Sequence, residues 1–155
     1  MSIKASKLLS DPVNVQLLRL LVADPRVTTS ELARRIDMSA PAIRERVQRL
    51  EEAGVIAGYR TDLDPRALGY TVTVIVRVRP MPGRVAQIAE LARATPNVVE
   101  CHRITGEDCF FMKAHLHSLD DLDDLLDRFL VYGTTTTSIA QSSPVPPRQL
   151  PLADA

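Results

Sequence analysis

The sequence lacks several features that mark whole classes of protein. Its unbroken apolar runs are only a few residues long, whereas a membrane-spanning helix needs about 18 to 20 residues. The start, MSIKASKLLSDP, has no signal-peptide architecture. The two cysteines, Cys101 and Cys109, do not make a disulfide framework, and free thiols suit a reducing compartment. We therefore expect a soluble, cytoplasmic protein that does not contact a membrane.

Motifs of enzymes and metal proteins are missing as well. The chain has no Gly-rich phosphate loop, nucleophile elbow or pair of catalytic carboxylates, so no catalytic residue can be named. Soft metal ligands lack the Cys-x-x-Cys or His-x-x-x-His spacing of a zinc site. They are Cys101, His102, Cys109, His115 and His117. We expect no catalysis, no bound metal and no cofactor.

Length and charge leave a nucleic-acid-binding protein open. The 155 residues suffice for one ordinary domain or two small ones, since domains run from about 50 to 250 residues. The formal net charge is zero, but residues 1–62 hold ten Lys and Arg against eight Asp and Glu, and the remainder holds nine against eleven. This asymmetry favours a basic N-terminal unit only weakly. Whether that unit binds nucleic acid therefore has to be judged from the placement of charges on its helix surfaces.

The first 58 residues carry start and stop signals for three helices. Asp11 followed by Pro12 begins one helix, and Asp24-Pro25 ends it. Thr28 to Glu31 has the spacing of a capping box and begins a short second helix. Ser39 can cap a third, which Gly54 ends. Short helices joined by a tight turn and packed on a longer first helix indicate a helix-turn-helix DNA-binding domain over residues 1–58.

The third predicted helix has a thin buried stripe and an arginine-bearing outer face. Ile43, Val47 and Leu50 form the stripe, and at about 100° per residue the other positions lie opposite it or on its flanks. Small residues at the start allow close approach to a groove, and arginines can reach phosphates or guanine edges. The candidate DNA contacts are Ser39, Pro41, Ala42, Arg44, Glu45, Arg46, Gln48 and Arg49. A face that is merely solvated is the alternative.

A second unit follows a polar linker predicted over residues 59–69. Alternating valines in TVTVIVRVR predict a strand, and a helical spacing begins at Val85. VVECHRIT and CFFMKAHLH predict a hairpin, Ser118 caps a further helix, and TTTTSIAQS predicts a last strand. The order βαββαβ is the ferredoxin-like arrangement, which we assign to residues 70–143, and residues 144–155 are predicted to be a loose tail.

In this arrangement both helices cover one face of the sheet. The last helix is predicted to turn Leu119, Leu122, Leu126 and Phe129 inward. The opposite face would expose side chains such as Ile75 and Phe111, and an exposed apolar sheet face usually marks an association surface. We expect a homodimer built sheet to sheet, which also suits a helix-turn-helix reading a two-fold repeated site.

The chain resembles the Lrp/AsnC, or feast/famine, family of transcription regulators. The resemblance is carried by TTSELARRIDMSAPAIRERVQRLEEAGVIAGYRTDLDPRALGY, by the βαββαβ unit and by its ITGEDCF turn. It implies an α+β protein with a winged-helix-like helix-turn-helix domain that binds promoter or operator DNA. It also implies a RAM or ACT-like domain that binds a small molecule, usually an amino acid, and assembles dimers into octamers or similar rings. The implied function is regulation of amino-acid metabolism genes.

The resemblance further implies an effector site near the turn between the second and third strands, where dimers meet. The corresponding residues are Thr105, Gly106, Glu107 and Asp108, with Thr136 and Ser142 of the last strand nearby. Many members have Gly-Asp-Tyr-Asp here, but this chain has Gly106-Glu107-Asp108-Cys109. Backbone N–H groups beside a glycine can hold a carboxylate and an acid can hold an ammonium group. A plain hairpin turn with solvated acids is the alternative.

An alternative function follows from the same second unit. A lone βαββαβ module of this kind can act as an amino-acid-sensing or assembly unit without specific DNA binding. Such chains lack the N-terminal helices that this sequence predicts. Specific duplex binding would favour the regulator, and binding of an amino acid alone would favour the sensor module.

Overall fold

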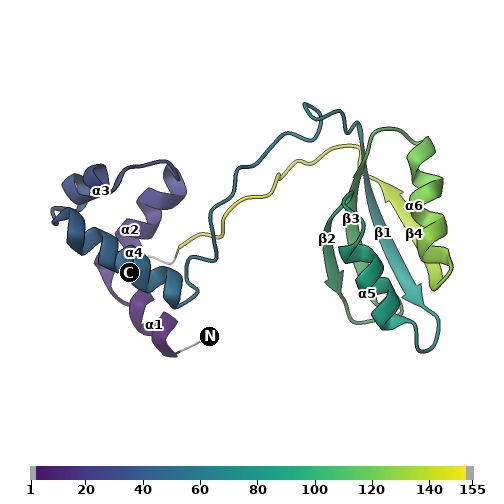
Figure 1. Cartoon of the computed structure of the whole chain (residues 1–155), viewed down its shortest axis with the longest axis horizontal. Helices are drawn as coiled ribbons and strands as arrows, with labels where there is room; N and C mark the ends of the chain where they lie inside the picture. Colours follow the sequence, from purple (N-terminus) through teal and green to yellow (C-terminus); the bar gives the residue numbers. More distant parts are fainter. Residues whose placement is uncertain (1–2, 153–155) are drawn as a thin grey trace. The chain divides into compact units, whose positions relative to one another are not determined.

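A computed structural model describes residues 3–152, which divide into two units (Figure 1). One unit holds residues 3–61 together with 147–152, and the other holds residues 62–146. The division falls inside the segment predicted to be the linker. That segment contains a turn in which the Tyr70 N–H donates to the Pro65 carbonyl at 2.9 Å. None of the helices described for this chain has the length and apolar character needed to span a bilayer.

The N-terminal unit is helical over its described residues. Its elements are α1 (Ile3–Leu9), α2 (Pro12–Ala23), α3 (Thr29–Ile36) and α4 (Ala40–Glu52). The three predicted side-chain caps are confirmed, because Asp11, Thr28 and Ser39 each accept a backbone N–H in the first turn of α2, α3 and α4. The helix α1 was not predicted from the sequence.

Helices α2, α3 and α4 pack around one small apolar core. Leu17, Ile43 and Leu50 are fully buried, and Leu18 and Leu32 are nearly so. The predicted inward stripe of α4 is therefore confirmed at Ile43 and Leu50, and Val47 packs partly buried against the same core. Gly54 follows the helix with φ of 69°, a left-handed conformation that glycine adopts without strain.

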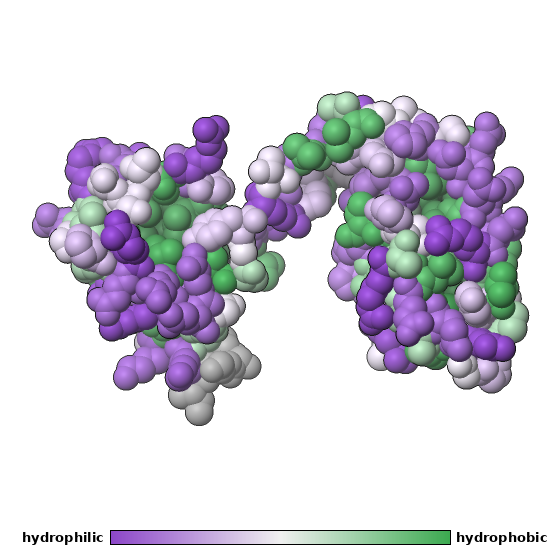
Figure 2. Space-filling model, viewed as in Figure 1, coloured by the Kyte–Doolittle hydropathy of each residue, from purple (hydrophilic) through white to green (hydrophobic). Residues whose placement is uncertain are grey.

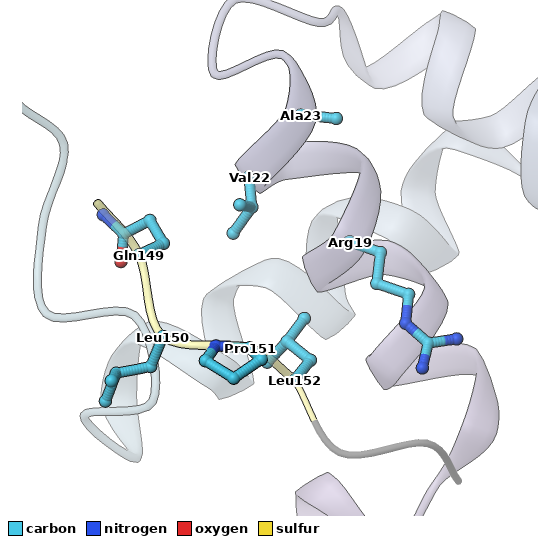
Figure 3. Close-up of a pocket in the computed structure, with 7 residues that line it drawn as sticks. All are labelled: Arg19, Val22, Ala23, Gln149, Leu150, Pro151 and Leu152. Carbon is cyan, nitrogen blue, oxygen red and sulfur yellow. The ribbon is translucent and has the colours of Figure 1, made fainter. Parts of the chain in front are cut away.

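The C-terminal tail was predicted to be loose, but its described end packs against the N-terminal unit. Leu152 packs against the core of the N-terminal unit, and the tail and α2 border a hollow of about 360 Å³. Figure 3 shows the Leu152 side chain directed toward α2 and the Leu150 side chain directed away from it. The prediction missed this docking because a single leucine among prolines has no periodicity to reveal a partner. Residues 153–155 of the predicted tail lie outside the described residues.

The C-terminal unit has the predicted βαββαβ order. Its elements are β1 (Val72–Pro80), α5 (Val85–Arg93), β2 (Val98–Arg103), β3 (Phe110–Leu116), α6 (Asp120–Leu130) and β4 (Gly133–Ile139). The strands form one sheet in the order β2-β3-β1-β4, and all neighbouring strands are antiparallel. The α+β, ferredoxin-like prediction is confirmed.

Both helices cover the same face of this sheet, as predicted. The buried side chains of β1 and β3 pack with Ile88 and Ala92 of α5 and with Leu125 and Phe129 of α6. The strand residues are Val74, Val76, Val78, Phe110, Met112, Ala114 and Leu116. In the view of Figure 2 the surface of each unit is mostly hydrophilic, with apolar patches separated by polar side chains.

The start of α6 corrects two predictions. Leu119, not Ser118, occupies the N-cap position, and no side chain caps the helix there. The Asp121 carboxylate instead accepts the backbone N–H groups of His117 and Ser118, at 3.1 and 3.0 Å. Leu119 is 55% exposed rather than inward, and Leu125, which was not predicted to face inward, is buried. Leu119 precedes the helix and so lies off its inward stripe, while the predicted Leu122, Leu126 and Phe129 do pack in the core.

Candidate DNA-binding helix and effector turn

The outer face of α4 is the first candidate site. Pro41, Arg44, Glu45, Gln48 and Arg49 are exposed, as is the N-cap Ser39, while Ala42 is half-buried. The Ser39 Oγ accepts the Ala42 backbone N–H at 3.4 Å, which leaves a helix start made of small side chains at the surface. This end of a recognition helix can approach base edges closely.

Surface ion pairs engage the charged residues of this face. Arg49 pairs with Glu45 one turn earlier, and the two side chains are 62% and 61% exposed. Gln48 donates to Glu52 at 2.8 Å. An exposed pair of this spacing stabilises a helix by only about 0.3 to 0.5 kcal/mol. Arg49 can therefore exchange Glu45 for a phosphate at small cost.

Arg46 lies differently from the other predicted contacts. Its Nη1 donates to the Asp11 carboxylate at 2.6 Å and to the Asn14 side-chain oxygen at 2.7 Å. Its side chain is 27% exposed. The hydrogen bond from Arg46 is the main reason that the pKa of Asp11 lies below its usual value. The Arg46 guanidinium thus points toward α2 and away from the exposed face of α4 that carries the other predicted DNA contacts.

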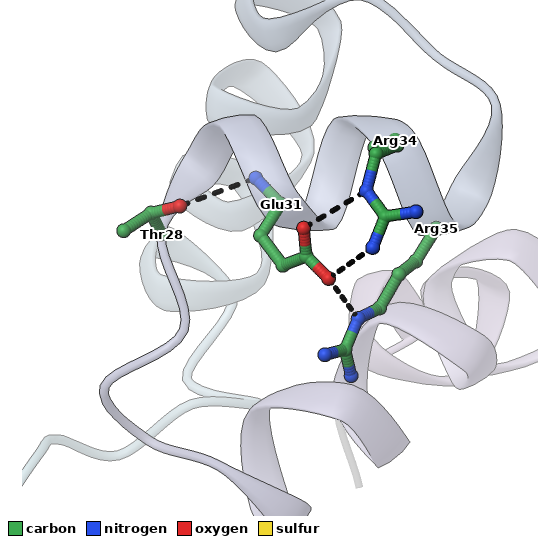
Figure 4. A network of polar contacts seen from close by, with 4 residues as sticks. All are labelled: Thr28, Glu31, Arg34 and Arg35. Atoms are coloured by element: carbon green, nitrogen blue, oxygen red, sulfur yellow. Dashed lines mark hydrogen bonds and ion pairs between the residues drawn. The ribbon is translucent and has the colours of Figure 1, made fainter.

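Helix α3 carries a second arginine cluster, which was not predicted as functional (Figure 4). Arg34 donates to both oxygens of the Glu31 carboxylate, at 3.0 and 2.7 Å, and Arg35 donates to one of them at 2.6 Å. Arg34 and then Arg35 lower the pKa of Glu31 from 4.5 to about 2. The spacing i, i+3 and i, i+4 was the signal that could have revealed this cluster. The Glu31 carboxylate is thereby held within α3.

The predicted effector turn is an exposed hairpin connection. The Ile104 N–H donates to the Cys109 carbonyl at 3.0 Å, and the Cys109 N–H donates to the Val78 carbonyl at 3.0 Å. Gly106 has φ of 109°, where a side chain would be strained. Glu107 is 83% exposed and Asp108 only 22% exposed. Asp108 is thus the more firmly held of the two acids.

Two arginines of β1 face these acids, and sequence reasoning missed both. Arg77 Nη1 lies 3.4 Å from Asp108 Oδ2, and Arg79 Nε lies 3.9 Å from Asp108 Oδ1. Arg79 also pairs with Glu107. The antiparallel register sets Val78 opposite Phe110, so the arginines on either side of Val78 meet the turn that precedes β3. Arg77 and Arg79 alternate with the buried valines of β1, and this alternation could have indicated that both arginines lie on the open face of the sheet.

The two predicted positions near the last strand fare differently. Thr136 lies in β4 opposite Arg77, so it shares the open sheet face with the arginine. Ser142 does not lie in the last strand, because β4 ends at Ile139. The pairing of β4 stops where β1 begins: Val74 pairs with Ile139, and the Ala140 N–H makes a last bond to the Thr73 carbonyl at 2.9 Å.

The open sheet face carries charged as well as apolar side chains. Ile75 and Phe111 are half-buried there, beside Arg77, Arg79 and Lys113. Thr73 Oγ1 lies 2.9 Å from His115 Nδ1 on the same face. Burial, and secondarily Lys113, lowers the pKa of His115 below its usual value. Within residues 3–152 no group of three or more His, Cys, Asp or Glu side chains is placed to hold a metal ion.

A helix-turn-helix with an exposed recognition helix, joined to a ferredoxin-like domain with a charged turn, defines a DNA-binding transcription regulator. The model of the Lrp/AsnC ligand binding domain matches residues 73–150, and a winged helix-turn-helix DNA-binding model matches residues 10–57. The chain belongs to the Lrp/AsnC family. It is a transcription regulator and not an enzyme.

Relatives match most of the chain. It is 30% identical to the HTH-type transcriptional regulator LrpC of Bacillus subtilis, over 83% of this chain and 90% of that one. It is 33% identical to LrpA of Mycobacterium tuberculosis, over 82% and 85% of the two chains. The solved structure of B. subtilis LrpC has a TM-score of 0.80 at 29% identity and covers 86% of this chain and 95% of its own.

One related structure contains an amino acid. The feast or famine regulatory protein of M. tuberculosis, complexed with L-methionine, has a TM-score of 0.79 at 30% identity. The match covers 90% of this chain and 97% of that one.

Proposed function

We propose that this regulator binds a two-fold repeated operator as a homodimer and controls amino-acid metabolism genes in response to an amino acid. The observation that carries the proposal is the exposed face of α4, where arginines and small residues lie opposite a fully buried Ile43 and Leu50. A transcription regulator acts where the DNA is, so we place it in the cytoplasm.

The proposed DNA contacts form one strip along α4. They are Ser39, Pro41, Ala42, Arg44, Glu45, Gln48 and Arg49. The exposure of all of them except the half-buried Ala42, and the low cost of opening the Arg49 to Glu45 pair, support this assignment over a purely solvated face. Arg46 belongs to the predicted set, but its present partners give it the different role inferred below.

Duplex binding tests this assignment directly. Duplexes selected by the wild-type protein from a random-sequence library serve as probes, and affinity is measured by fluorescence anisotropy over a range of salt concentrations. Loss of a phosphate contact in Arg49→Ala should lower the salt slope by about one. Arg128→Ala in α6 is a control, since it removes the same charge from an exposed site of the other unit. Unchanged affinity and slope for Arg44→Ala and Arg49→Ala would contradict the assignment.

The proposed effector site is the turn of Thr105, Gly106, Glu107 and Asp108, with Thr136 on the neighbouring strand. Asp108 is the partner for the ligand ammonium, because it is mostly buried and held by Arg77 and Arg79. The same arginines and the backbone beside Gly106 offer donors for the ligand carboxylate. The methionine complex of the M. tuberculosis relative supports an amino acid as the class of ligand.

The turn is exposed, so the ligand needs further walls from a second dimer. Binding should then favour whichever assembly completes the site, an octamer or a similar ring. Ligand and DNA must change each other's affinity by the same factor, typically about 5- to 150-fold. The homodimer itself is proposed to form through the open sheet face around Ile75 and Phe111.

A thermal-shift screen of the common amino acids, L-methionine included, tests the effector assignment. A ligand at about a hundred times its dissociation constant stabilises the protein by roughly 2.7 kcal/mol. Calorimetry on Asp108→Asn should show weakened binding of the ligand so identified, while the exposed Asp123→Asn serves as control. Equal binding by both variants would reject the site. An amino-acid response without any duplex binding would instead indicate a sensor or assembly module.

A further inference from the structure

A polar cluster around one buried asparagine of the N-terminal unit joins α4 to the rest of the helix-turn-helix. Asn14 of α2 is only 2% exposed. Its Nδ2 donates to the Leu8 carbonyl, in α1, at 3.0 Å, and its Oδ1 accepts Arg46 Nη1, from α4, at 2.7 Å. Both ends of one buried amide are therefore satisfied, and each bond leads to a different helix.

Asp11 completes the cluster with two separate tasks. Its Oδ1 accepts the Val13 backbone N–H at 2.9 Å and so caps α2. Its Oδ2 accepts Arg46 Nη1 at 2.6 Å. The carboxylate that begins α2 is thus the one that holds α4. Arg46 and Asp11 are separated by 35 positions in the sequence, so this contact exists only in the folded unit.

These bonds supply what the apolar contacts of α4 cannot. Burial of Ile43 and Leu50 sets which face of α4 turns to the core, but apolar attraction is not directional and holds the exact rotation about the helix axis less tightly. Hydrogen bonds weaken steeply when their angle changes, so Arg46 resists such rotation. A binding surface has to be held within about 10 to 20° of its productive orientation.

We infer that Arg46 is a positioning residue, which fixes the rotation of α4 through Asp11 and Asn14 and does not itself contact DNA. The inference rests on the proposed reading of DNA by α4. Both bonds come from Nη1, so a phosphate contact by that group would require Arg46 to leave two acceptors at once, and one of them, Asn14, is too buried for water to replace the lost partner. Arg49 has no such constraint, because its partner Glu45 is 61% exposed.

The salt dependence of duplex binding separates the two roles. The probes are again duplexes selected by the wild-type protein, and all measurements are made well below each variant's melting temperature. Arg46→Met, which keeps the length of the side chain, should weaken binding by about tenfold. Its salt slope should equal that of the wild type, because no phosphate contact is lost. The matched variant Arg49→Met should lower the slope by about one.

A double-mutant cycle gives the second readout. Asn caps a helix as well as Asp does, so Asp11→Asn preserves the cap and removes the charge and the second acceptor oxygen that hold Arg46. Asp11→Asn alone should weaken duplex binding with an unchanged slope, and adding Arg46→Met should weaken it little further. Arg46→Lys, which retains the charge, should restore part of the affinity. A general loss of folding would not produce this selective recovery.

Each contrary result has a distinct meaning. A slope lowered by about one in Arg46→Met, with effects that add to those of Asp11→Asn, would make Arg46 a phosphate contact and overturn the inference. Unchanged duplex affinity in Arg46→Met would overturn it too. If Arg46→Met does not fold, an unchanged affinity in Asp11→Asn overturns it instead. If the wild-type protein selects no duplex, the proposed function fails and the positioning role falls with it.

Discussion

Shortening one leucine of the C-terminal tail should destabilise the N-terminal unit. Leu152 packs against the core that contains Leu17 and Ile43, although it lies more than a hundred residues later in the sequence. Leu150, two positions earlier, is 86% exposed. The tail therefore offers a matched pair of substitutions, Leu152→Ala and Leu150→Ala, that differ in burial but not in chemistry.

The expected size follows from the burial of each side chain. Burying a leucine completely stabilises a protein by about 1.5 to 3 kcal/mol. Leu152 is half-buried and lies at the margin of the core, where water can fill the space left by substitution. We expect a loss of about 1 kcal/mol for Leu152→Ala, which in a unit of this size lowers the melting temperature by about 4 to 8 °C. Leu150→Ala should change it by less than about 2 °C, in proportion to its small burial.

Differential scanning calorimetry of the full chain measures both effects. The N-terminal unit should melt earlier in Leu152→Ala, and the transition of the C-terminal unit should stay in place because its core contains no tail residue. Equal shifts in the two variants, or no shift in either, would show that the tail does not dock on α2 in solution and would refute the reasoning.

Three further predictions concern other parts of the chain. Gly133→Ala should cost about 1 to 3 kcal/mol in urea unfolding, because a Cβ on Gly133 would overlap the Arg79 backbone carbonyl; wild-type stability would mean that β4 shifts freely. Glu31→Gln should lower the melting temperature at neutral pH. The pKa of Glu31 is depressed from 4.5 to about 2, so its stabilisation is present above pH 4.5 and disappears as the pH falls through 2. A difference between variant and wild type that persists at pH 2 would contradict this origin. Ile75→Asp should dissociate the homodimer in sedimentation velocity, since an unpaired charge in an interface costs several kcal/mol, while Val145→Asp, at an exposed site off the sheet, should leave it intact.

Local patterns were enough to predict most of the elements. Asp11, Thr28 and Ser39 were identified as caps because a cap depends on residues two or three positions away. The βαββαβ order followed from alternation and helical spacing, which are equally local. The start of α6 was misplaced because Ser118 is a good capping residue by type, whereas Leu119 occupies the N-cap position without a side-chain cap. The inward stripe was nevertheless predicted correctly at Leu122, Leu126 and Phe129.

The partners of charged side chains that lie far away in the sequence were decided by tertiary structure alone. A helical wheel sets Arg46 on the flank of the buried stripe and Arg49 opposite it, but only the packing of α4 on α2 shows that Arg46 meets Asp11 and Asn14. In the same way, the pairing of β1 with β3 brings Arg77 to Asp108, which is 31 positions away. Periodicity reports which face a side chain occupies, because it depends on the local backbone. Which partner lies across from that face depends on how segments distant in the sequence pack together. Local sequence patterns do not report that packing, so only the tertiary structure decides it.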